Sequence, residues 1–105
     1  MYDIIIVGAG PAGLTSAIYA ARANKKVLVL EAKVPGGQIV NASKIENYPG
    51  IENISGSDFA MNLYNQVINL GIEIKFETVL SIYPLSFCIS DVLVGTLIST
   101  QLLEV

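Results

Sequence analysis

The chain has 105 residues, a formal net charge of −3 and no histidine, and 52% of its residues are apolar. This length allows one small domain or a part of a larger one, with enough apolar residues for a core. The acidic balance argues against nucleic acid as a partner, because binding to phosphates favours a basic surface. Without histidine, the chain lacks the most common acid–base group at neutral pH and the most common zinc ligand. We therefore expect no metal site and assign no catalytic residue.

Cysteine usage and hydropathy indicate a cytoplasmic protein. The single cysteine, Cys88, can form neither an internal disulfide nor a C-x-x-C redox pair, and we interpret it as an inert apolar residue. The N-terminus lacks the features of a signal peptide, because Asp3 stands where a basic region is expected. No stretch of about 18 residues is free of charged or strongly polar side chains, so no membrane span is predicted.

The first part of the chain predicts a strand, a glycine-rich turn, a helix and a second strand. Tyr2 to Val7 predict the first strand, because four consecutive apolar β-branched residues follow Asp3, a run typical of a parallel strand buried on both faces. After GAGPAG, apolar residues recur at helical spacing from Ala12 onward. Asn24 is a suitable helix stop, because asparagine tolerates a left-handed backbone. Val27 to Leu30 predict the second strand, which completes a βαβ unit of about the expected length.

The middle of the chain predicts a loop-rich stretch, a second helix and a half-exposed strand. Glycine and proline are frequent from Ala32 to Ser57. The helix that follows has Ser55 or Ser57 as its capping residue, and Gly71 ends it as a C′ glycine. After Gly71, apolar and charged residues alternate as far as Glu77. This period of two predicts a strand with one exposed face.

The last segment, residues 83–105, differs in composition from the rest. It contains no lysine or arginine, and its only charged residues are Asp91 and Glu104. The stretch VLVGTLIST is compatible with a strand or a strand pair. Two origins are open: an unrelated terminus, as a frameshift or truncation would produce, or a divergent replacement that supplies strands to the sheet. An incomplete sheet would leave an edge and an apolar face uncovered, so a homodimer stays open as well.

GAGPAG is the motif that carries chemistry, and its spacing is G-x-G-x-x-G. Gly8 lets the chain turn off the strand, Gly10 lets the backbone approach a pyrophosphate, and Gly13 lets helix and strand pack closely. The helix N-terminus offers free N–H groups and a partial positive charge of about half a unit to the phosphates. Glu31, at the end of the second strand, can accept hydrogen bonds from ribose hydroxyls. Its negative charge would repel a 2′-phosphate, which argues against NADP as the ligand of this site. The alternative is a glycine turn in an α/β sheet without a ligand.

Residues 1–82 resemble the N-terminal FAD-binding domain of bacterial thioredoxin reductases. The resemblance lies in three motifs in the same order and spacing: GAGPAGLTSAIYAARA, GGQ and ENYPG. GAGPAG is shared by many flavoproteins, whereas the three together are much more specific; ferredoxin reductases of the thioredoxin-reductase type are the nearest alternatives. The resemblance implies an α/β, Rossmann-like, three-layer FAD/NAD(P)-binding fold with a parallel, incomplete sheet. Residues 1–82 would form the FAD-binding segment and residues 83–105 an apolar tail.

The resemblance also implies which residues would hold FAD. They are Gly8, Gly10, Pro11, Ala12 and Gly13 at the pyrophosphate, Glu31 and Ala32 at the adenosine ribose, Gly37 and Gln38 at the ribityl and flavin part, Asn47 near the isoalloxazine, and Val79 at the adenine through its backbone. Amides and a closely approaching backbone suit a flavin, which is flat and polar along one edge. From the residues alone, Gln38 and Asn47 are equally compatible with ordinary loop positions, and Val79 with a core position.

The resembled family passes electrons from NADPH through FAD and a C-x-x-C disulfide to thioredoxin. This chain has no second G-x-G-x-x-G and no C-x-x-C, and from Tyr83 onward it does not match the family pattern. We therefore expect the FAD-binding portion of a thioredoxin-disulfide reductase-like flavoprotein that does not complete the reaction alone. FAD and a thioredoxin-like protein are the partners implied. The alternatives are a non-catalytic FAD- or ADP-binding module, a truncated fragment that binds nothing and, more remotely, an NAD-binding dehydrogenase domain.

Overall fold

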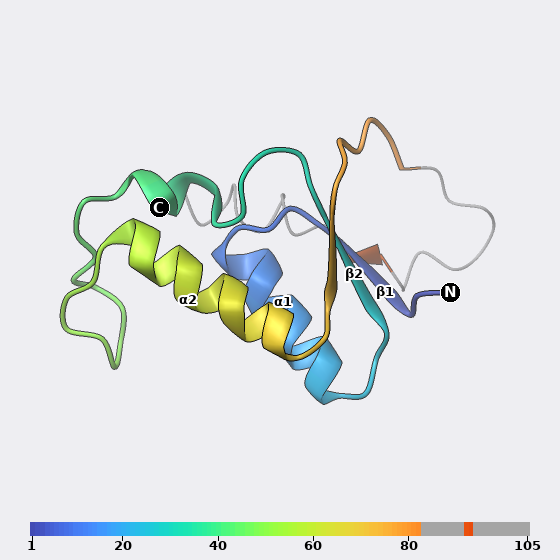
Figure 1. Cartoon of the computed structure of the whole chain (residues 1–105), viewed down its shortest axis with the longest axis horizontal. Coiled ribbons are helices and arrows are strands. Elements are labelled where there is room, and N and C mark those ends of the chain that lie inside the picture. Colours follow the sequence, from blue (N-terminus) through green and yellow to red (C-terminus); the bar gives the residue numbers. More distant parts are fainter. Residues whose placement is uncertain (83–91, 94–105) are drawn as a thin grey trace.

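The computed structural model describes residues 1–82 and 92–93 and shows a parallel sheet with helices packed against it (Figure 1). Along the chain the elements are β1 (Ile4–Val7), α1 (Pro11–Arg22), β2 (Val27–Glu31), the 3₁₀ helix η1 (Gly37–Asn41), α2 (Gly56–Asn69), β3 (Glu73–Phe76) and β4 (Val92–Leu93). The strand order is β3-β2-β1-β4, and all neighbours are parallel. The α/β prediction is confirmed, and the described residues supply the sheet and one helical layer.

The sheet register brings the carboxyl ends of the strands to one edge. β1 pairs with β2 along its whole length, β2 pairs with all of β3, and β4 meets β1 at Ile5 and Ile6. Parallel neighbours need a crossover connection, which α1 provides between β1 and β2 and α2 provides between β2 and β3. The two helices contact each other and lie side by side in Figure 1. The loops that follow the strands therefore gather at one edge of the sheet.

The hydrophobic core lies between the sheet and the two helices. Helical spacing on α1 and alternation on the strands supply its residues, as the sequence predicts. Its fully buried members include Ile6, Ala9, Leu14, Val29 and Val67. Leu28 is also buried but stands outside this cluster. Because side chains alternate along a strand, Leu28 lies on the other face of the sheet.

Both helices end where the sequence predicts. Asn24 has a φ of 59° just after α1, and Gly71 has a φ of 75° just after α2, so both adopt the left-handed conformation of a helix stop. Of the two serines considered as caps for α2, Ser55 takes the role, because its hydroxyl accepts the N–H of Asp58 at 3.1 Å. These signals are local, and the structure confirms them.

Two elements begin at a different residue from the predicted one. α1 starts at Pro11, one residue early, which suits proline because the first helical N–H needs no partner. β1 starts at Ile4 and not at Tyr2. The preceding Asp3 directs its carboxylate to the N–H of Lys26, which it accepts at 2.7 Å. The N–H of Asp3 also donates to the carbonyl oxygen of Lys26 at 2.8 Å, so both the backbone and the side chain of Asp3 bind the residue that precedes β2.

Two elements lie in segments that the sequence left without a definite structure. η1 forms within the loop-rich stretch, where hydrophobic periodicity gives no signal for a short 3₁₀ turn. β4 forms within the apolar tail, at the beginning of VLVGTLIST. Residues 83–91 and 94–105 lie outside the described residues. The interpretation of Cys88 as an inert apolar residue and the rest of the strand or strand pair predicted in VLVGTLIST therefore stay predictions. The division of the chain at residue 82 stays a prediction.

The backbone of α2 touches η1 at Gly56. The N–H of Gly56 donates to the carbonyl oxygen of Ala42 at 2.8 Å. A Cβ at Gly56 would lie 1.8 Å from the carbonyl oxygen of Ile39, so no side chain fits there. This contact fixes the start of α2 directly against η1.

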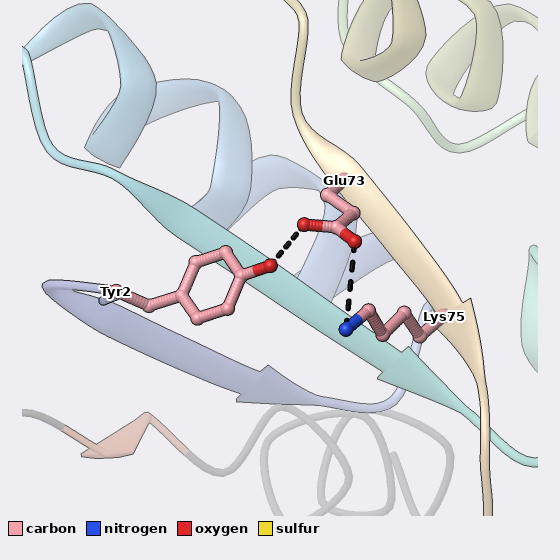
Figure 2. Close-up of polar contacts among 3 residues, drawn as sticks. All are labelled: Tyr2, Glu73 and Lys75. Carbon is pink, nitrogen blue, oxygen red and sulfur yellow. Dashed lines mark hydrogen bonds and ion pairs between the residues drawn. The ribbon is translucent and has the colours of Figure 1, made fainter.

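A polar bridge crosses β2 at the amino end of the sheet, opposite the loops that follow the strands. The hydroxyl of Tyr2 donates to the carboxylate of Glu73, and Lys75 Nζ lies 3.6 Å from the other carboxylate oxygen (Figure 2). Tyr2 precedes β1 and Glu73 begins β3, so the bridge links the strands on either side of β2. Lys26 Nζ lies 5.5 Å from the centre of the Tyr2 ring. The hydrogen bond from Tyr2 lowers the pKa of Glu73, and the same bond raises the pKa of Tyr2.

Gly56→Ala is expected to destabilise the protein by about 1–3 kcal/mol, because the added methyl group must displace the backbone of η1. Urea unfolding followed by circular dichroism would show this loss as a lower midpoint. Asn62→Ala, at an exposed position of α2, is the matched control and should change stability by less than about 0.5 kcal/mol. An unchanged midpoint for Gly56→Ala would show that α2 does not pack this closely on η1.

Tyr2→Phe is expected to raise the pKa of Glu73 toward its ordinary value, because it removes the donor that favours the carboxylate. A carboxyl group whose pKa is lowered by folding stabilises the fold at neutral pH, and this contribution is lost as the pH falls through the lowered pKa. The thermal midpoint of Tyr2→Phe should therefore lie slightly below that of the unmodified chain at neutral pH and converge with it in acid. Carboxyl-carbon NMR measures the titration directly, and identical Glu73 curves in the two proteins would refute the bridge.

Candidate functional site

The glycine-rich loop Gly8–Gly13 makes the turn from β1 into α1. Gly8 has a φ of 102°, a conformation that residues with a side chain rarely adopt. A Cβ at Gly13 would lie 2.0 Å from the carbonyl oxygen of Gly8, so the helix and the loop touch backbone to backbone. Gly13 is buried, and the structure assigns it the close packing that the glycine spacing predicts.

The first turn of α1 presents backbone donors without partners. Gly10 is the N-cap and has no side chain that could accept a hydrogen bond, and Pro11 has no N–H. Among the residues that the structure describes, nothing accepts the N–H groups of Ala12 and Gly13, whereas that of Leu14 bonds to Gly10 at 2.9 Å. Such unpaired N–H groups carry the positive end of the helix dipole, and together they form an anion site.

The carboxylate of Glu31 ties the end of β2 to the glycine-rich loop. One oxygen accepts the N–H of Ala9 at 2.7 Å, and the other accepts the N–H of Lys33 at 2.8 Å. The carbonyl oxygen of Ala9 in turn accepts the N–H of Gly36 at 2.6 Å. Ala9 is fully buried, so these two partners satisfy its backbone. Each oxygen of Glu31 keeps a further acceptor position for another donor.

Of these groups, Gly10, Ala12 and Glu31 line a cleft of about 1340 Å³ at the carboxyl edge of the sheet. Its walls come from the loops after β1 and β2, from η1, from the segment after β3 and from α2. Ligands of open parallel sheets bind outside the carboxyl ends of the strands, which is the position of this cleft. The charged side chains in the described wall are Glu31, Lys33 and Glu77. An anionic ligand would therefore depend mainly on backbone N–H groups.

Most residues predicted to hold a cofactor line this cleft. They are Gly8, Gly10, Pro11, Ala12, Glu31, Ala32, Gly37, Gln38 and Val79. The cleft thus brings together four segments that are far apart in the sequence. Gly13 lies beneath the loop and does not line the cleft, and Asn47 is exposed outside it. The contact of each residue with a cofactor stays a prediction.

The cleft also contains side chains that sequence reasoning did not propose as binding residues. Tyr48 and Phe59 line its wall, with ring centroids 4.9 Å apart. Phe59 is buried, whereas Tyr48 is about half exposed. Pro49 and Gly50 signal a turn, but a turn signal does not tell toward which neighbour Tyr48 points. Lys33 also lines the cleft without a sequence signal of its own.

Other classes of site find no support in the part of the chain that the structure describes. Within residues 1–82 and 92–93, His, Cys, Asp and Glu side chains form no group of three or more that could hold a metal ion. No helix in these ranges combines the length and the apolar character that crossing a membrane requires.

Comparison with known proteins identifies relatives over most of the chain. The family model described as pyridine nucleotide-disulphide oxidoreductase matches residues 2–91. Thioredoxin reductases of Ureaplasma parvum and Borreliella burgdorferi are 47% and 49% identical to the chain over 77 and 81 residues. These matches cover 73% and 76% of the chain, and 25% of each relative. The chain therefore spans about a quarter of the length of the curated relatives it matches.

The fold is also similar to solved structures of thioredoxin reductases from other organisms. The crystal structure of thioredoxin reductase from Streptococcus pyogenes superposes with a TM-score of 0.79 at 44% sequence identity. The match covers 82% of this chain and 28% of that one. This likeness confirms the Rossmann-like fold and the resemblance to the N-terminal part of thioredoxin reductases. The chain belongs to the pyridine nucleotide-disulphide oxidoreductase family.

Proposed function

We propose that this chain is the FAD-binding portion of a thioredoxin-reductase-like flavoprotein. The observation that carries the proposal is that the open first turn of α1 and the carboxylate of Glu31 meet in one cleft. A dinucleotide needs these two features close together, because its pyrophosphate is an anion and its ribose hydroxyls are donors. Membership of the family and the thioredoxin reductase relatives support the same function.

The start of α1 fits a pyrophosphate without a cluster of basic side chains. Gly10 leaves the N-cap open. Gly37 has a φ of 62° and lies beside the loop, because a Cβ there would be in van der Waals contact with the Cα of Gly10 at 3.4 Å. Lys33 is the one basic residue in the described wall. Backbone N–H groups and the helix dipole would thus balance most of the phosphate charge.

Glu31 fits the adenosine ribose. Its hydrogen bonds to the N–H groups of Ala9 and Lys33 hold the carboxylate in place, and the remaining acceptor positions can receive ribose hydroxyls. A 2′-phosphate at this point would meet a carboxylate, so the cleft would discriminate against NADP. Ala32 continues the wall beside the ribose, and Val79, in the segment after β3, is the residue that we assign to the adenine.

The flavin end of the ligand would lie against η1. Gly37 and Gln38 line the cleft there, and the Gln38 amide is suited to the polar edge of a flavin. Bound FAD would supply the electron-transfer chemistry that no side chain in the described wall of the cleft provides. The residues of the chain bind and orient it.

The family reaction, NADPH-dependent reduction of a thioredoxin disulfide, needs more than a bound flavin. In this 105-residue sequence Cys88 is the single cysteine and the G-x-G-x-x-G motif occurs once, so a dithiol and a second nucleotide site are lacking. We therefore propose that the chain alone binds FAD without reducing thioredoxin. An ADP-type ligand is the second candidate occupant, because the glycine-rich loop and Glu31 would recognise the adenosine and phosphate half alone.

The proposed function is tested by titrating the purified chain with FAD and with ADP, followed by flavin fluorescence and calorimetry. We expect saturable binding of both ligands, displacement of FAD by ADP, and much weaker competition by adenosine 2′,5′-bisphosphate. No saturable binding of either ligand would contradict the proposal. The FAD-loaded chain, given NADPH and oxidised thioredoxin, should show no sustained turnover. Sustained turnover would contradict the proposal that the chain alone does not reduce thioredoxin.

Glu31→Ala is expected to weaken both the fold and ligand binding. The substitution leaves the buried N–H of Ala9 without its acceptor, which costs about 1–3 kcal/mol. Hydrogen exchange at the Ala9 amide should accelerate, the urea midpoint should fall, and the affinities for FAD and ADP should fall together. Glu52→Ala, at an exposed glutamate outside the cleft, is the matched control. Unchanged protection of the Ala9 amide in Glu31→Ala would show that the carboxylate does not hold the loop.

A further inference from the structure

β3 forms one edge of the sheet. Among residues 1–82 and 92–93 it pairs only with β2, and it stands last in the strand order. The outer side of an edge strand offers a row of N–H and C=O groups to another chain. Charged side chains on an edge normally oppose such pairing, unless the incoming strand presents opposite charges in register. β3 carries two charged residues, Glu73 and Lys75, so its own charge pattern determines which strand it can accept.

The hydrogen bonds of the sheet show which residues of β3 turn their backbone outward. The carbonyl oxygen of Leu30 accepts an N–H from the residue that follows β1, so the even-numbered residues of β2 face β1 and the odd-numbered ones face β3. Val29 stands opposite Ile74, and a residue in a parallel pair bonds to the two neighbours of its opposite residue. The odd-numbered residues of β3 therefore face β2, whereas Ile74 and Phe76 turn their N–H and C=O groups outward.

The side chains of β3 are sorted between the two faces of the sheet. Ile74 packs against the hydrophobic core under the helices, and Phe76 lies on the same face but is 59% exposed. Glu73 and Lys75 lie together on the opposite face, where their charged atoms are 3.6 Å apart (Figure 2). The hydroxyl of Tyr2 donates to the Glu73 carboxylate from the β1 side and helps to hold it in place. The edge thus presents one acid and one base, two positions apart, above an apolar face.

We propose that β3 pairs antiparallel with β3 of a second copy of this chain, with Ile74 opposite Ile74 on a two-fold axis. In this register Glu73 of each copy stands opposite Lys75 of the other copy. On the helix side of the sheet, Ile72 stands opposite the exposed Phe76. Opposite residues of an antiparallel pair share a face, so charges meet charges and apolar side chains meet apolar ones. The outward N–H and C=O groups of Ile74 exchange hydrogen bonds across the axis, and the two sheets become one.

The charge pattern selects this register over its neighbours. A two-fold axis at Glu73 would place two carboxylates opposite each other, and an axis at Lys75 would place two ammonium groups there. An axis between Ile74 and Lys75 would set each charged side chain opposite an apolar one. The pairing uses residues 72–76, none of which lines the cleft. The inference is therefore independent of the proposed function.

The test measures the association of the full chain by analytical ultracentrifugation over a range of concentrations. The unmodified chain should show a monomer–dimer equilibrium. Lys75→Glu and Glu73→Lys each place like charges opposite each other, so each should weaken dimerisation about tenfold or more. An equimolar mixture of these two variants should restore dimers, because the acidic pair of one then faces the basic pair of the other. Lys25→Glu, in the exposed turn after α1, is the matched control and should dimerise as the unmodified chain does.

Amide hydrogen exchange followed by NMR distinguishes this pairing from any other contact between two copies. Exchange at the Ile74 and Phe76 amides should slow as the concentration rises and dimers form. The amides of Glu73 and Lys75, which face β2, should be protected at every concentration. Three results would overturn the inference: a monomer at all concentrations, a mixture of the two charge variants that associates no better than either alone, or exchange at Ile74 that does not depend on concentration.

Discussion

The hydrogen bond of 2.7 Å between the N–H of Ala9 and the carboxylate of Glu31 joins the end of β2 to the loop after β1. Ala9 is fully buried, so no water can replace this acceptor, and an unsatisfied donor there would cost about 1–3 kcal/mol. The carbonyl oxygen of Ala9 holds Gly36 in the same way at 2.6 Å. One buried residue therefore sets the relative positions of the glycine-rich loop, the turn after β2 and η1. The cleft is the space that these three segments enclose together with α2 and the segment after β3.

The glycines serve both packing and chemistry. Gly13 and Gly56 let backbones touch where any side chain would collide, and so bring α1 against its loop and α2 against η1. The same absence of side chains leaves the first turn of α1 uncapped at Gly10. An uncapped helix start is less stable than a capped one, and an anion bound there would satisfy its donors. The feature that weakens the isolated helix is therefore the feature that suits it to a phosphate.

The sequence predicts those parts of the molecule that depend on local signals. Periodicity predicts the βαβ unit, and the helix stops at Asn24 and Gly71 follow from backbone preferences of single residues. The glycine spacing predicts the turn into α1 for the same reason. The position of η1 and the different placement of Asn47 and Tyr48 depend on hydrogen bonds and ring contacts between segments distant in sequence. No pattern within the ENYPG segment distinguishes the side chain that faces the cleft from the one that does not.

The most direct test of the account is an NMR titration of the isotope-labelled chain with ADP, in which each backbone amide is followed separately. The central claim is that the open first turn of α1 receives the phosphates while Glu31 receives the ribose. It predicts saturable shifts with one common affinity, largest at the amides of Ala12 and Gly13 and also present at Ala9 and Lys33, the two donors to Glu31. Shifts that do not saturate, or that are largest away from the glycine-rich loop, would contradict the account.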